Sequence, residues 1–566
     1  MSRPDWIVLV VTLLAIIAYG LYKSRTSRDL DGYILSNRTV PWYMVLLGIM
    51  GTQASAVTFL SAPGQAYTDG MRFVEYYFGL PLAMIVVCIT FVPIFHRLKV
   101  YTAYEFLERR FDLKTRALTA FLFLLQRGLS TGISIAAPSI ILSSLLGWNI
   151  IWTNIIMGGV LIIYTVTGGA KAVAYTQQLQ MIIIFAGMAI AGLIVVHRLP
   201  PGVGWKEVMH LAGRAGKLNI VTTGFEGHKG FDWNDRYNLL SGIIGGFFLA
   251  LSYFGTDQSQ VGRYLTARSL RESRLGLLLN GLVKVPMQFL ILLLGVFVFV
   301  FYQYNRRPVF FNESQLTTLA HSRYGDSIRV LRERYNAEEQ ERVALANSGG
   351  GVRLDQLEVL QAADRATVKR WLGEVGGDAN DTNYIFLRFV TDYLPVGLIG
   401  LLIAVIMLAA WGSIAAALNS LASCTIVDFH RRFSRQPLAP EREYRLSRWY
   451  TLLWGIICVA MAQLAYNVGN SLIEAVNVLG SLFYGVVLGV FLVAFYRRKV
   501  GGQAVFISAV IVEAGVIVLA ILGKRGIVPL SFLWYNAVGA VGVLVLSEVL
   551  QAVIGRARKY DKNAMS

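Results

Sequence analysis

The stretch GIMGTQASAVTFLSAPGQAYTDG (48–70) decides the fold, because it is apolar enough to enter a membrane but unfit to cross it as a plain helix. Small and polar residues occupy its middle, and Pro63 followed by Gly64 is expected to break the helical hydrogen bonds. A second stretch, GGFFLALSYFGTDQSQVGRY (245–264), carries polar residues at 255–260. Backbone groups freed at such breaks need ions, substrate or neighbouring helices as partners, so paired broken helices indicate the midplane site of a transporter. Ordinary kinks packed against neighbouring helices are the alternative.

The composition of the chain places both stretches in a bilayer. Of 566 residues, 55% are hydrophobic and 15% are charged, whereas soluble domains carry about 25% charged residues. This depletion excludes a water-soluble enzyme, a disordered scaffold and a secreted disulfide module. The sequence therefore predicts an all-α integral membrane protein with about thirteen transmembrane helices. The apolar runs lie at about 6–22, 41–66, 73–96, 117–145, 148–168, 173–196, 239–262, 275–303, 394–427, 449–465, 472–495, 504–523 and 530–554.

The two broken runs divide these spans into halves. Each broken run begins a series of five spans. Because five is an odd number, the two series cross the membrane in opposite orientations, as an inverted five-plus-five repeat requires. The expected parts are an additional helix with a cytoplasmic loop (1–40), the first repeat (41–198), an external loop (199–238), the second repeat (239–495) and two helices with a short tail (496–566).

A long loop at 304–383 lies within the second repeat. Two polar-faced helical stretches, separated by the glycines at 349–351, predict an external hairpin that caps the mouth of the protein. A partner-binding role for this hairpin is the alternative.

The distribution of basic residues predicts the topology. Apart from the loop at 304–383, alternate connections hold 28 Lys and Arg on one side of the membrane and 10 on the other. Short loops rich in Lys and Arg stay in the cytoplasm, so we expect the N-terminus outside and the C-terminus in the cytoplasm. The first run has only Arg3 before it and several basic residues after it, the reverse of a signal peptide, so we expect it to be retained.

The same distribution accounts for the net charge of +18 without a nucleic-acid partner. We expect the partners to be a small-molecule solute and the lipid bilayer, with no obligate protein partner. The loop lengths and the retained first run fit a plasma membrane, in particular a bacterial inner membrane.

Two basic residues lie inside spans. Arg127 is about eleven residues into its helix, which at ~1.5 Å per residue places it near the midplane. It either binds an anionic group of the substrate or pairs with Glu75 or another internal carboxylate. Lys284, close to Pro286, is expected to contact carbonyls freed at a kink.

Several motifs together resemble those of the sodium:solute symporter family. They are AYEFLERRF (103–111), SAVTFLSAPGQAYTDG (55–70), YTVTGGAKAVAYTQ (164–177), TDQSQVGRYL (256–265) and LNSLASCTIVDF (418–429). APSIIL (137–142) is more similar to the multivitamin, monocarboxylate and iodide branch, with the sialic-acid-like branch also near, whereas TDQ resembles the sugar branch. The substrate class therefore stays open between these branches.

The resemblance implies a LeuT-type fold, alternating access and a sodium ion between the first and eighth core helices. The matching positions are Gly51, Ala54 and Ala409, through their carbonyls, with Gly412 and Ser413. Oxygen ligands from an unwound backbone suit a hard cation.

This chain departs from the family pattern at the sodium positions. Gly412 offers no side-chain ligand, Ala415 and Ala416 replace further hydroxyl residues, and Gln177 stands where an acid commonly follows the Gly-Gly turn. A second sodium site is therefore not expected, and sodium is the only cofactor that the resemblance implies. Proton coupling or uncoupled exchange on the same fold is the alternative.

The resemblance also implies a substrate cavity. Anion-transporting relatives carry an arginine on the third core helix, and the aligned position here is Ser130. Arg127 lies one helical turn away, so it can present its guanidinium from the same face of that helix. We therefore expect a small carboxylate-bearing or otherwise anionic solute. The candidate substrate residues are Ser55, Thr58, Tyr77 (or its neighbour Tyr76), Arg127, Ser130, Asp257, Gln258, Gln260 and Asn477, with Glu474 as a further candidate.

Two other function classes were weighed against transport. No HExxH or P-loop pattern supports an enzyme. A non-transporting membrane sensor needs an output domain, and the tail after Gly555 has only about a dozen residues.

Overall fold

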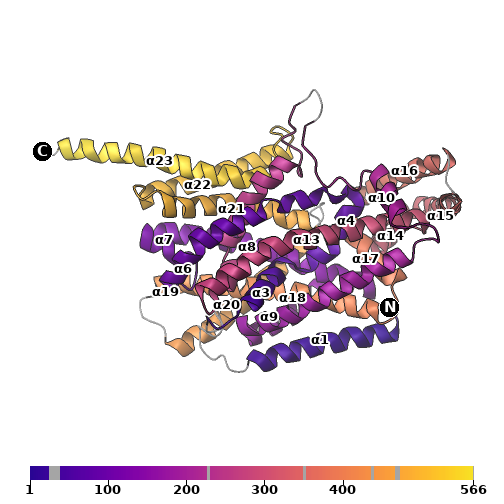
Figure 1. The fold of residues 1–566 in the computed structure, drawn as a ribbon, viewed down its shortest axis with the longest axis horizontal. Helices are drawn as coiled ribbons and strands as arrows, with labels where there is room; N and C mark the ends of the chain where they lie inside the picture. Colours follow the sequence, from indigo (N-terminus) through magenta and orange to yellow (C-terminus); the bar gives the residue numbers. More distant parts are fainter. Residues whose placement is uncertain (25–37, 226–229, 349–351, 435–438, 466–471, 565–566) are drawn as a thin grey trace.

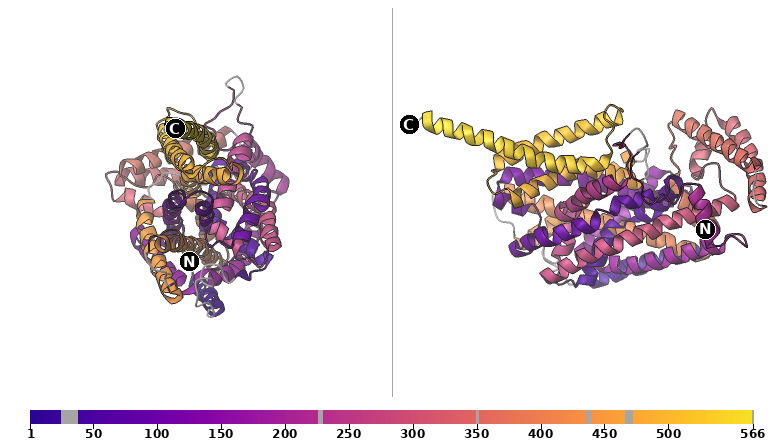
Figure 2. Two further views of the ribbon diagram at one scale, coloured as in Figure 1. Left: turned by 90° about the vertical axis from the view of Figure 1, so that its left-hand side faces the viewer. Right: turned by 45° about the horizontal axis from the view of Figure 1, so that its top comes forward.

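The computed structural model describes residues 1–24, 38–225, 230–348, 352–434, 439–465 and 472–564. Its long helices run roughly along one common axis (Figure 1). The N-terminus lies toward the end of the bundle that carries the helices α15 (Gly325–Asn347) and α16 (Val352–Glu374), and the C-terminus projects from the opposite end (Figure 2).

The helices of the first half follow the predicted runs closely. Their bounds are α1 (Arg3–Ser24), α3 (Trp42–Gln53), α4 (Ala56–Asp69), η2 (Met71–Tyr77), α5 (Leu80–Val86), η3 (Val87–Phe91), α6 (Val92–Leu98), α7 (Glu105–Arg110), α8 (Leu113–Leu146), α9 (Ile150–His197) and α10 (Trp205–Arg214).

The second half has the same character, with a long insertion. Its bounds are η5 (Ser241–Gly245), α11 (Gly246–Thr256), α12 (Gln258–Leu265), α13 (Leu270–Tyr304), α14 (Glu313–Ala320), the hairpin α15 and α16, α17 (Thr382–Tyr393), α18 (Leu398–Cys424), η6 (Thr425–His430), α19 (Arg431–Phe433), α20 (Pro440–Ala465), α21 (Leu472–Tyr496), α22 (Gly502–Lys524) and α23 (Phe532–Ala564).

Within the described residues, nine helices are long and apolar enough to cross a membrane, or ten if the bent pair α3 and α4 is one span. The predicted runs at 148–168 and 239–262 correspond to shorter apolar helices, Ile150–Val166 and Ser241–Thr256. The run at 449–465 falls in α20, which begins with the charged segment PEREYRLSR. The count of thirteen spans and the division into parts stay predictions.

Both predicted broken helices are broken, but the first breaks at a different residue. The axes of α3 and α4 differ by 59°, and the chain leaves helical geometry at Ala54 and Ser55. The prediction of a break at Pro63 and Gly64 is wrong, since both lie inside α4. The second break falls at Asp257, which is extended and accepts a hydrogen bond from the Ser259 backbone N–H at 2.8 Å.

Pro63 and Gly64 instead allow neighbouring elements to approach α4. A methyl group on Gly64 would lie 2.0 Å from the Thr382 carbonyl oxygen, and one on Gly295 of α13 would lie 2.2 Å from the Pro63 carbonyl oxygen. Both separations are shorter than any van der Waals contact, so these backbones pack directly on each other.

We expect Gly295→Ala to lower the free energy of unfolding by about 1–3 kcal/mol, because the added methyl group forces α13 away from α4. Thermal unfolding of the detergent-purified protein measures this change. Gly515→Ala on α22 is the matched control, since a methyl group there meets nothing within 4 Å. Equal midpoints for the two variants would contradict the direct packing.

The helix α9 contains two of the predicted spans. The Tyr164 Oη and Thr176 Oγ1 atoms lie 2.8 Å apart, although twelve residues of straight helix separate their Cα atoms by about 18 Å. The helix therefore bends sharply between them. The Gly-Gly pair at 168 and 169, where the sequence predicts a turn, lies between these two residues.

The predicted hairpin in the long loop is present as α15 and α16, and the glycines at 349–351 lie outside the described residues. Arg342 of α15 is fully buried and donates hydrogen bonds to the carbonyls of Gln303, Tyr302 and Asn305, at 2.5, 2.9 and 3.0 Å. Since a helix ends with unpaired carbonyls, this guanidinium caps α13 and fixes the hairpin to the end of the bundle.

Candidate functional site

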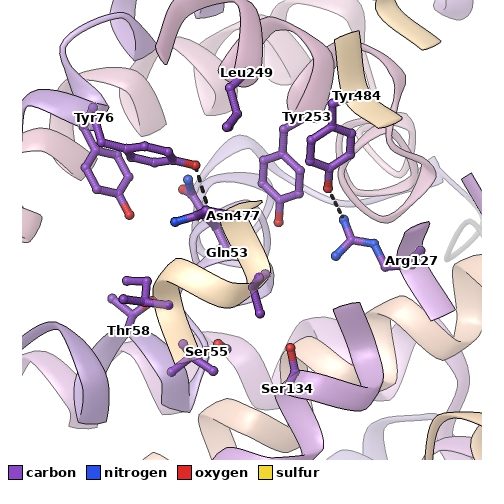
Figure 3. Close-up of a pocket in the computed structure, with 14 residues that line it drawn as sticks. Gln53, Ser55, Thr58, Tyr76, Arg127, Ser134, Leu249, Tyr253, Asn477 and Tyr484 are labelled. Carbon is purple, nitrogen blue, oxygen red and sulfur yellow. Dashed lines mark hydrogen bonds between the residues drawn. The ribbon is translucent and has the colours of Figure 1, made fainter. Parts of the chain in front are cut away.

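A cavity of about 90 Å³ lies where the first broken helix faces α8, α11 and α21 (Figure 3). Polar and aromatic side chains line most of it. The lining residues are Gln53, Ser55, Val57, Thr58, Tyr76, Tyr77, Arg127, Ser134, Leu249, Tyr253, Ile473, Val476, Asn477 and Tyr484.

One side of the cavity is aromatic. The ring centroids of Tyr76 and Tyr77 lie 4.7 Å apart at an interplanar angle of 78°, and Phe73 stacks on Tyr76 at 5.5 Å. The Tyr76 hydroxyl donates a hydrogen bond to the Asn477 Oδ1 atom at 3.1 Å (Figure 3). This bond joins η2 to α21 across the cavity, so a solute that enters between these two elements meets both side chains.

Arg127 lies on the opposite side of the cavity and forms an ion pair with Asp257 at the second helix break. The Arg127 Nη2 atom also donates to the Tyr484 hydroxyl at 3.2 Å, and this hydroxyl donates to the Asp257 Oδ2 atom at 2.9 Å. Asp257 is fully buried, whereas the Arg127 side chain keeps 11% of its surface exposed. The carboxylate is therefore enclosed and the guanidinium reaches the cavity.

The guanidinium of Arg127 keeps hydrogen-bonding capacity beyond this ion pair. Its Nε atom is buried and has no hydrogen-bond partner among the described residues, and its charge lies 5.5 Å from the centre of the Tyr253 ring. Glu75, the first partner weighed from the sequence, instead accepts a hydrogen bond from the Thr222 backbone N–H at 2.7 Å. Of the predicted pairings, the ion pair with another internal carboxylate is the one present.

The structure brings six of the sequence candidates together at this cavity. They are Ser55, Thr58, Tyr76, Tyr77, Arg127 and Asn477.

The other candidates lie behind the cavity wall or away from it. Asp257 holds Arg127, and the Ser130 hydroxyl accepts a hydrogen bond from the Gln126 amide at 2.9 Å. The Gln260 amide donates to the Tyr253 hydroxyl at 2.7 Å. Asp257 and Gln260 thus position residues that line the cavity, whereas Ser130 contacts Gln126, whose amide also donates to the Tyr484 hydroxyl at 3.1 Å.

Two further candidates are engaged elsewhere. Gln258 accepts a hydrogen bond from the Ala103 backbone N–H at 3.0 Å and donates one to the Tyr101 carbonyl at 2.8 Å, so it fastens the segment before α7. Glu474 pairs with Arg236. Neither side chain lines the cavity.

The sequence reasoning missed Gln53, Tyr253 and Tyr484. Tyr253 lies four residues before Asp257, and Tyr484 lies seven residues after Asn477. Both spacings return a side chain to the same helix face, so helical spacing from the chosen candidates could have found both tyrosines.

Lys284 does not contact carbonyls near Pro286 as predicted. It is fully buried, its Nζ atom lies 5.6 Å from the centre of the Tyr77 ring, and this atom has no hydrogen-bond partner among the described residues. Because Tyr77 lines the cavity, the Lys284 amine stands directly behind the cavity wall.

The predicted sodium ligands lie where α3 and α18 face each other. The break at Ala54 ends α3 and frees carbonyls of its last turn. Ala54 and Ala409 are buried, and the buried Ser413 hydroxyl donates to the Ala410 carbonyl at 2.9 Å, which leaves its oxygen lone pairs as acceptors.

Gln177 of α9 fills space between these two helices. Its amide Nε2 atom donates to the Gly412 carbonyl and to the Thr52 hydroxyl, both at 3.2 Å. A methyl group on Gly51 would lie 3.2 Å from carbon atoms of this side chain, and one on Gly412 would lie 2.7 Å from the Gln180 Oε1 atom and 3.2 Å from the Gln177 Cγ atom. The Gly412 carbonyl is therefore already hydrogen-bonded, and glycine at both positions makes room for glutamine side chains of α9.

Comparison with known proteins agrees with this geometry. The family model described as Sodium:solute symporter family matches residues 33–318 and 359–511. The chain is 24% identical over 564 residues to the Sodium/sialic acid symporter SiaT of Proteus mirabilis (strain HI4320), covering 98% of this chain and 96% of that protein. It is 26% identical over 500 residues to the human Sodium-coupled monocarboxylate transporter 1, covering 86% of this chain and 68% of that protein.

A solved structure has the same fold. It is the substrate-bound outward-open state of a Na⁺-coupled sialic acid symporter, which matches with a TM-score of 0.73 and 21% identity over 98% of both chains. The all-helical LeuT-type fold expected from the motifs is thus confirmed. Since the family model covers most of its residues, the chain belongs to the sodium:solute symporter family.

Proposed function

We propose that this sodium-coupled secondary transporter moves a small anionic organic solute across the plasma membrane by alternating access. Membership of the family makes the chain an integral membrane symporter rather than an enzyme. The observation that carries the anionic substrate is Arg127, which stands at the cavity with an unpartnered Nε atom. A guanidinium in a site of low dielectric recognises a carboxylate through charge and hydrogen-bond geometry.

Two further observations support an anion. Lys284 adds a basic side chain behind Tyr77, while the carboxylate that pairs with Arg127, Asp257, is enclosed by its own partners. Two relatives are named as symporters of sialic acid and of monocarboxylates, which are carboxylate-bearing solutes.

Within this proposal, Ser55, Thr58, Tyr77, Arg127 and Asn477 contact the solute from the cavity wall. Asp257 and Gln260 hold Arg127 and Tyr253 of the wall in place, Ser130 acts through Gln126, and Gln258 fastens the segment before α7. We place the N-terminus and the hairpin outside and the C-terminus in the cytoplasm, which agrees with the positions of the two termini at opposite ends of the bundle (Figure 1).

The sodium ion is proposed to bind between α3 and α18. Carbonyls of Gly51, Ala54 and Ala409 and the hydroxyl of Ser413 supply its oxygen ligands, and the Gly412 carbonyl stays with Gln177. Carbonyl and hydroxyl oxygens without a carboxylate suit a weakly bound monovalent cation that must later be released. One ion per cycle follows, since Gln177, Ala415 and Ala416 offer no charged or hydroxyl ligand for another.

We expect sodium to raise the thermal unfolding midpoint of the purified protein saturably relative to choline, because a ligand that binds only the folded state stabilises it. Ser413→Ala is expected to weaken sodium binding, so that the half-saturating sodium concentration rises at least tenfold. Ser139→Ala is the matched control, since Ser139 is also buried and also donates to a carbonyl of its own helix. Identical sodium responses in the wild type and Ser413→Ala would remove this site from the proposal.

Transport itself is tested in proteoliposomes with radiolabelled sialic acid, pyruvate and lactate under a sodium gradient. Uptake of at least one carboxylate that collapses when sodium is replaced by choline supports the proposal. Uptake driven by a proton gradient alone, or binding without uptake, would overturn it in favour of proton coupling or of a sensor.

A further inference from the structure

A second, smaller cavity lies between α12 and α18. Its volume is about 20 Å³, which exceeds the ~10–15 Å³ needed to hold one water molecule. Gln258 and Ser259 of its wall directly follow Asp257, whose ion pair with Arg127 forms part of the wall of the central cavity. The remaining lining residues are Gly262, Arg263, Ala416, Asn419, Ser420 and Ser423.

Arg263 brings an uncompensated charge to this cavity. Its surface is 7% exposed, and in the part of the chain that the structure describes its guanidinium has neither an ion pair nor a hydrogen bond. The buried carboxylates nearest in sequence to the cavity residues are engaged, Asp257 with Arg127 and Asp428 with Arg116. A buried cation without a counter-charge is costly, so this position calls for an anion.

Asn419 is the second unpartnered group in the same wall. It is 6% exposed, and neither its Oδ1 nor its Nδ2 atom has a partner among the described residues. The hydroxyl protons of Ser420 and Ser423 are already donated to carbonyls of α18. The hydrogen-bond donors left for a guest are therefore the Arg263 guanidinium and the Asn419 amide.

The surroundings of Arg263 explain why its charge is unbalanced. A methyl group built on Gly48 of α3 would lie 3.9 Å from the Arg263 Cδ atom and 3.8 Å from the Gln177 Oε1 atom. Arg263 and Gln177 thus both lie against the same face of Gly48, one helical turn before the sodium candidate Gly51. A carboxylate at position 177 would have been a counter-charge within reach, but the side chain present is neutral.

We propose that this cavity is an anion site on the cytoplasmic half of the translocation path, in which Arg263 and Asn419 bind a monovalent anion. The anion is either the carboxylate of the solute on its way from Arg127 to the cytoplasm or a free inorganic anion that occupies the cavity between cycles. The first source rests on the proposed transport of an anionic solute, and the second does not.

The test uses the full-length purified protein at constant sodium, with chloride, formate or gluconate as the anion. We expect chloride and formate to raise the thermal unfolding midpoint saturably by several degrees relative to gluconate, which is too large for the cavity. Arg263→Gln is expected to abolish this anion-dependent shift, and Arg127→Gln is expected to keep it. A shift lost in Arg127→Gln and kept in Arg263→Gln would place the anion in the central cavity and overturn the proposal.

Asn419→Asp keeps the proposal testable if Arg263→Gln fails to fold. It places a carboxylate beside Arg263, so the midpoint in gluconate should rise to at least the wild-type value in chloride, and chloride should add nothing further. An undiminished chloride response in Asn419→Asp would overturn the anion site. The sodium response of the same samples is read independently, so failure of the anion site is distinguishable from failure of sodium coupling.

Comparing half-saturating concentrations distinguishes the two sources. A lower value for formate than for chloride supports the carboxylate of the solute, and a lower value for chloride supports a free inorganic anion. The absence of any anion-dependent shift in the wild type would overturn both.

Discussion

Arg127→Met is expected to abolish uptake of every carboxylate that the protein transports and to lower the free energy of unfolding by about 3–5 kcal/mol. The second effect arises because Asp257 is fully buried, and removing its cation leaves a buried charge with only hydroxyl and backbone partners. Uptake into proteoliposomes and thermal unfolding in detergent measure the two effects separately.

The double variant Arg127→Met with Asp257→Leu separates binding from structure. Replacing both members of a buried ion pair with apolar residues of similar volume is often neutral for stability. The thermal unfolding midpoint of the double variant should therefore return most of the way to the wild-type value. Its uptake should stay abolished, since the guanidinium that faces the cavity is still missing. Recovery of uptake together with stability would make Arg127 purely structural and would remove the main support for an anionic substrate.

A second large effect is expected where α7 and η6 meet the start of α8. Arg116 is 4% exposed, and it donates to the fully buried Asp428 at 2.7–2.8 Å, to the Val427 carbonyl at 2.9 Å and to Glu108 at 2.7 Å. One guanidinium thus fastens α7 and η6 to the start of α8. Arg116→Met should cost about 3–5 kcal/mol of unfolding free energy, because the buried Asp428 carboxylate would lose its cation and keep neutral partners such as the Thr102 hydroxyl.

Arg432→Met is the matched control for this prediction. Arg432 also pairs with Glu108, but 45% of its side-chain surface is exposed, and exposed ion pairs are worth about 0–1 kcal/mol. The thermal midpoint should therefore fall far more for Arg116→Met than for Arg432→Met. Equal losses would mean that burial does not set the strength of this network.

The fold was largely predictable because the bilayer imposes strong rules on the sequence. Apolar runs, loop charges and two interrupted helices each leave a local pattern, and the motifs around Asp257 and Ser55 agree with them. The position of the first break was not predictable in this way. Proline usually breaks a helix, yet Pro63 lies inside α4. The glycine that follows it lets a neighbouring backbone pack closely against α4, and the helix breaks at Ala54 instead.

The residues of the candidate site were predictable only where a residue type is unusual at its depth in the membrane. Arg127 was found because a charge inside a span is costly, but its partner Asp257 lies 130 residues away, and no local pattern relates the two. Tyr253 and Tyr484 were missed because aromatic residues are common in membrane helices. Their roles depend on which helix faces meet, and that is decided by tertiary packing.

The neutral amide of Gln177, hydrogen-bonded between α3 and α18, has a consequence for energetics. At the proposed stoichiometry of one sodium ion and one monoanion per cycle, the translocated charge would sum to zero, and transport would be electroneutral. The membrane potential, which supplies about 2.3 kcal/mol per charge per 100 mV, then contributes nothing. A tenfold sodium gradient supplies about 1.4 kcal/mol, enough for tenfold accumulation and no more. Such a carrier suits a cell that consumes the solute as fast as it enters.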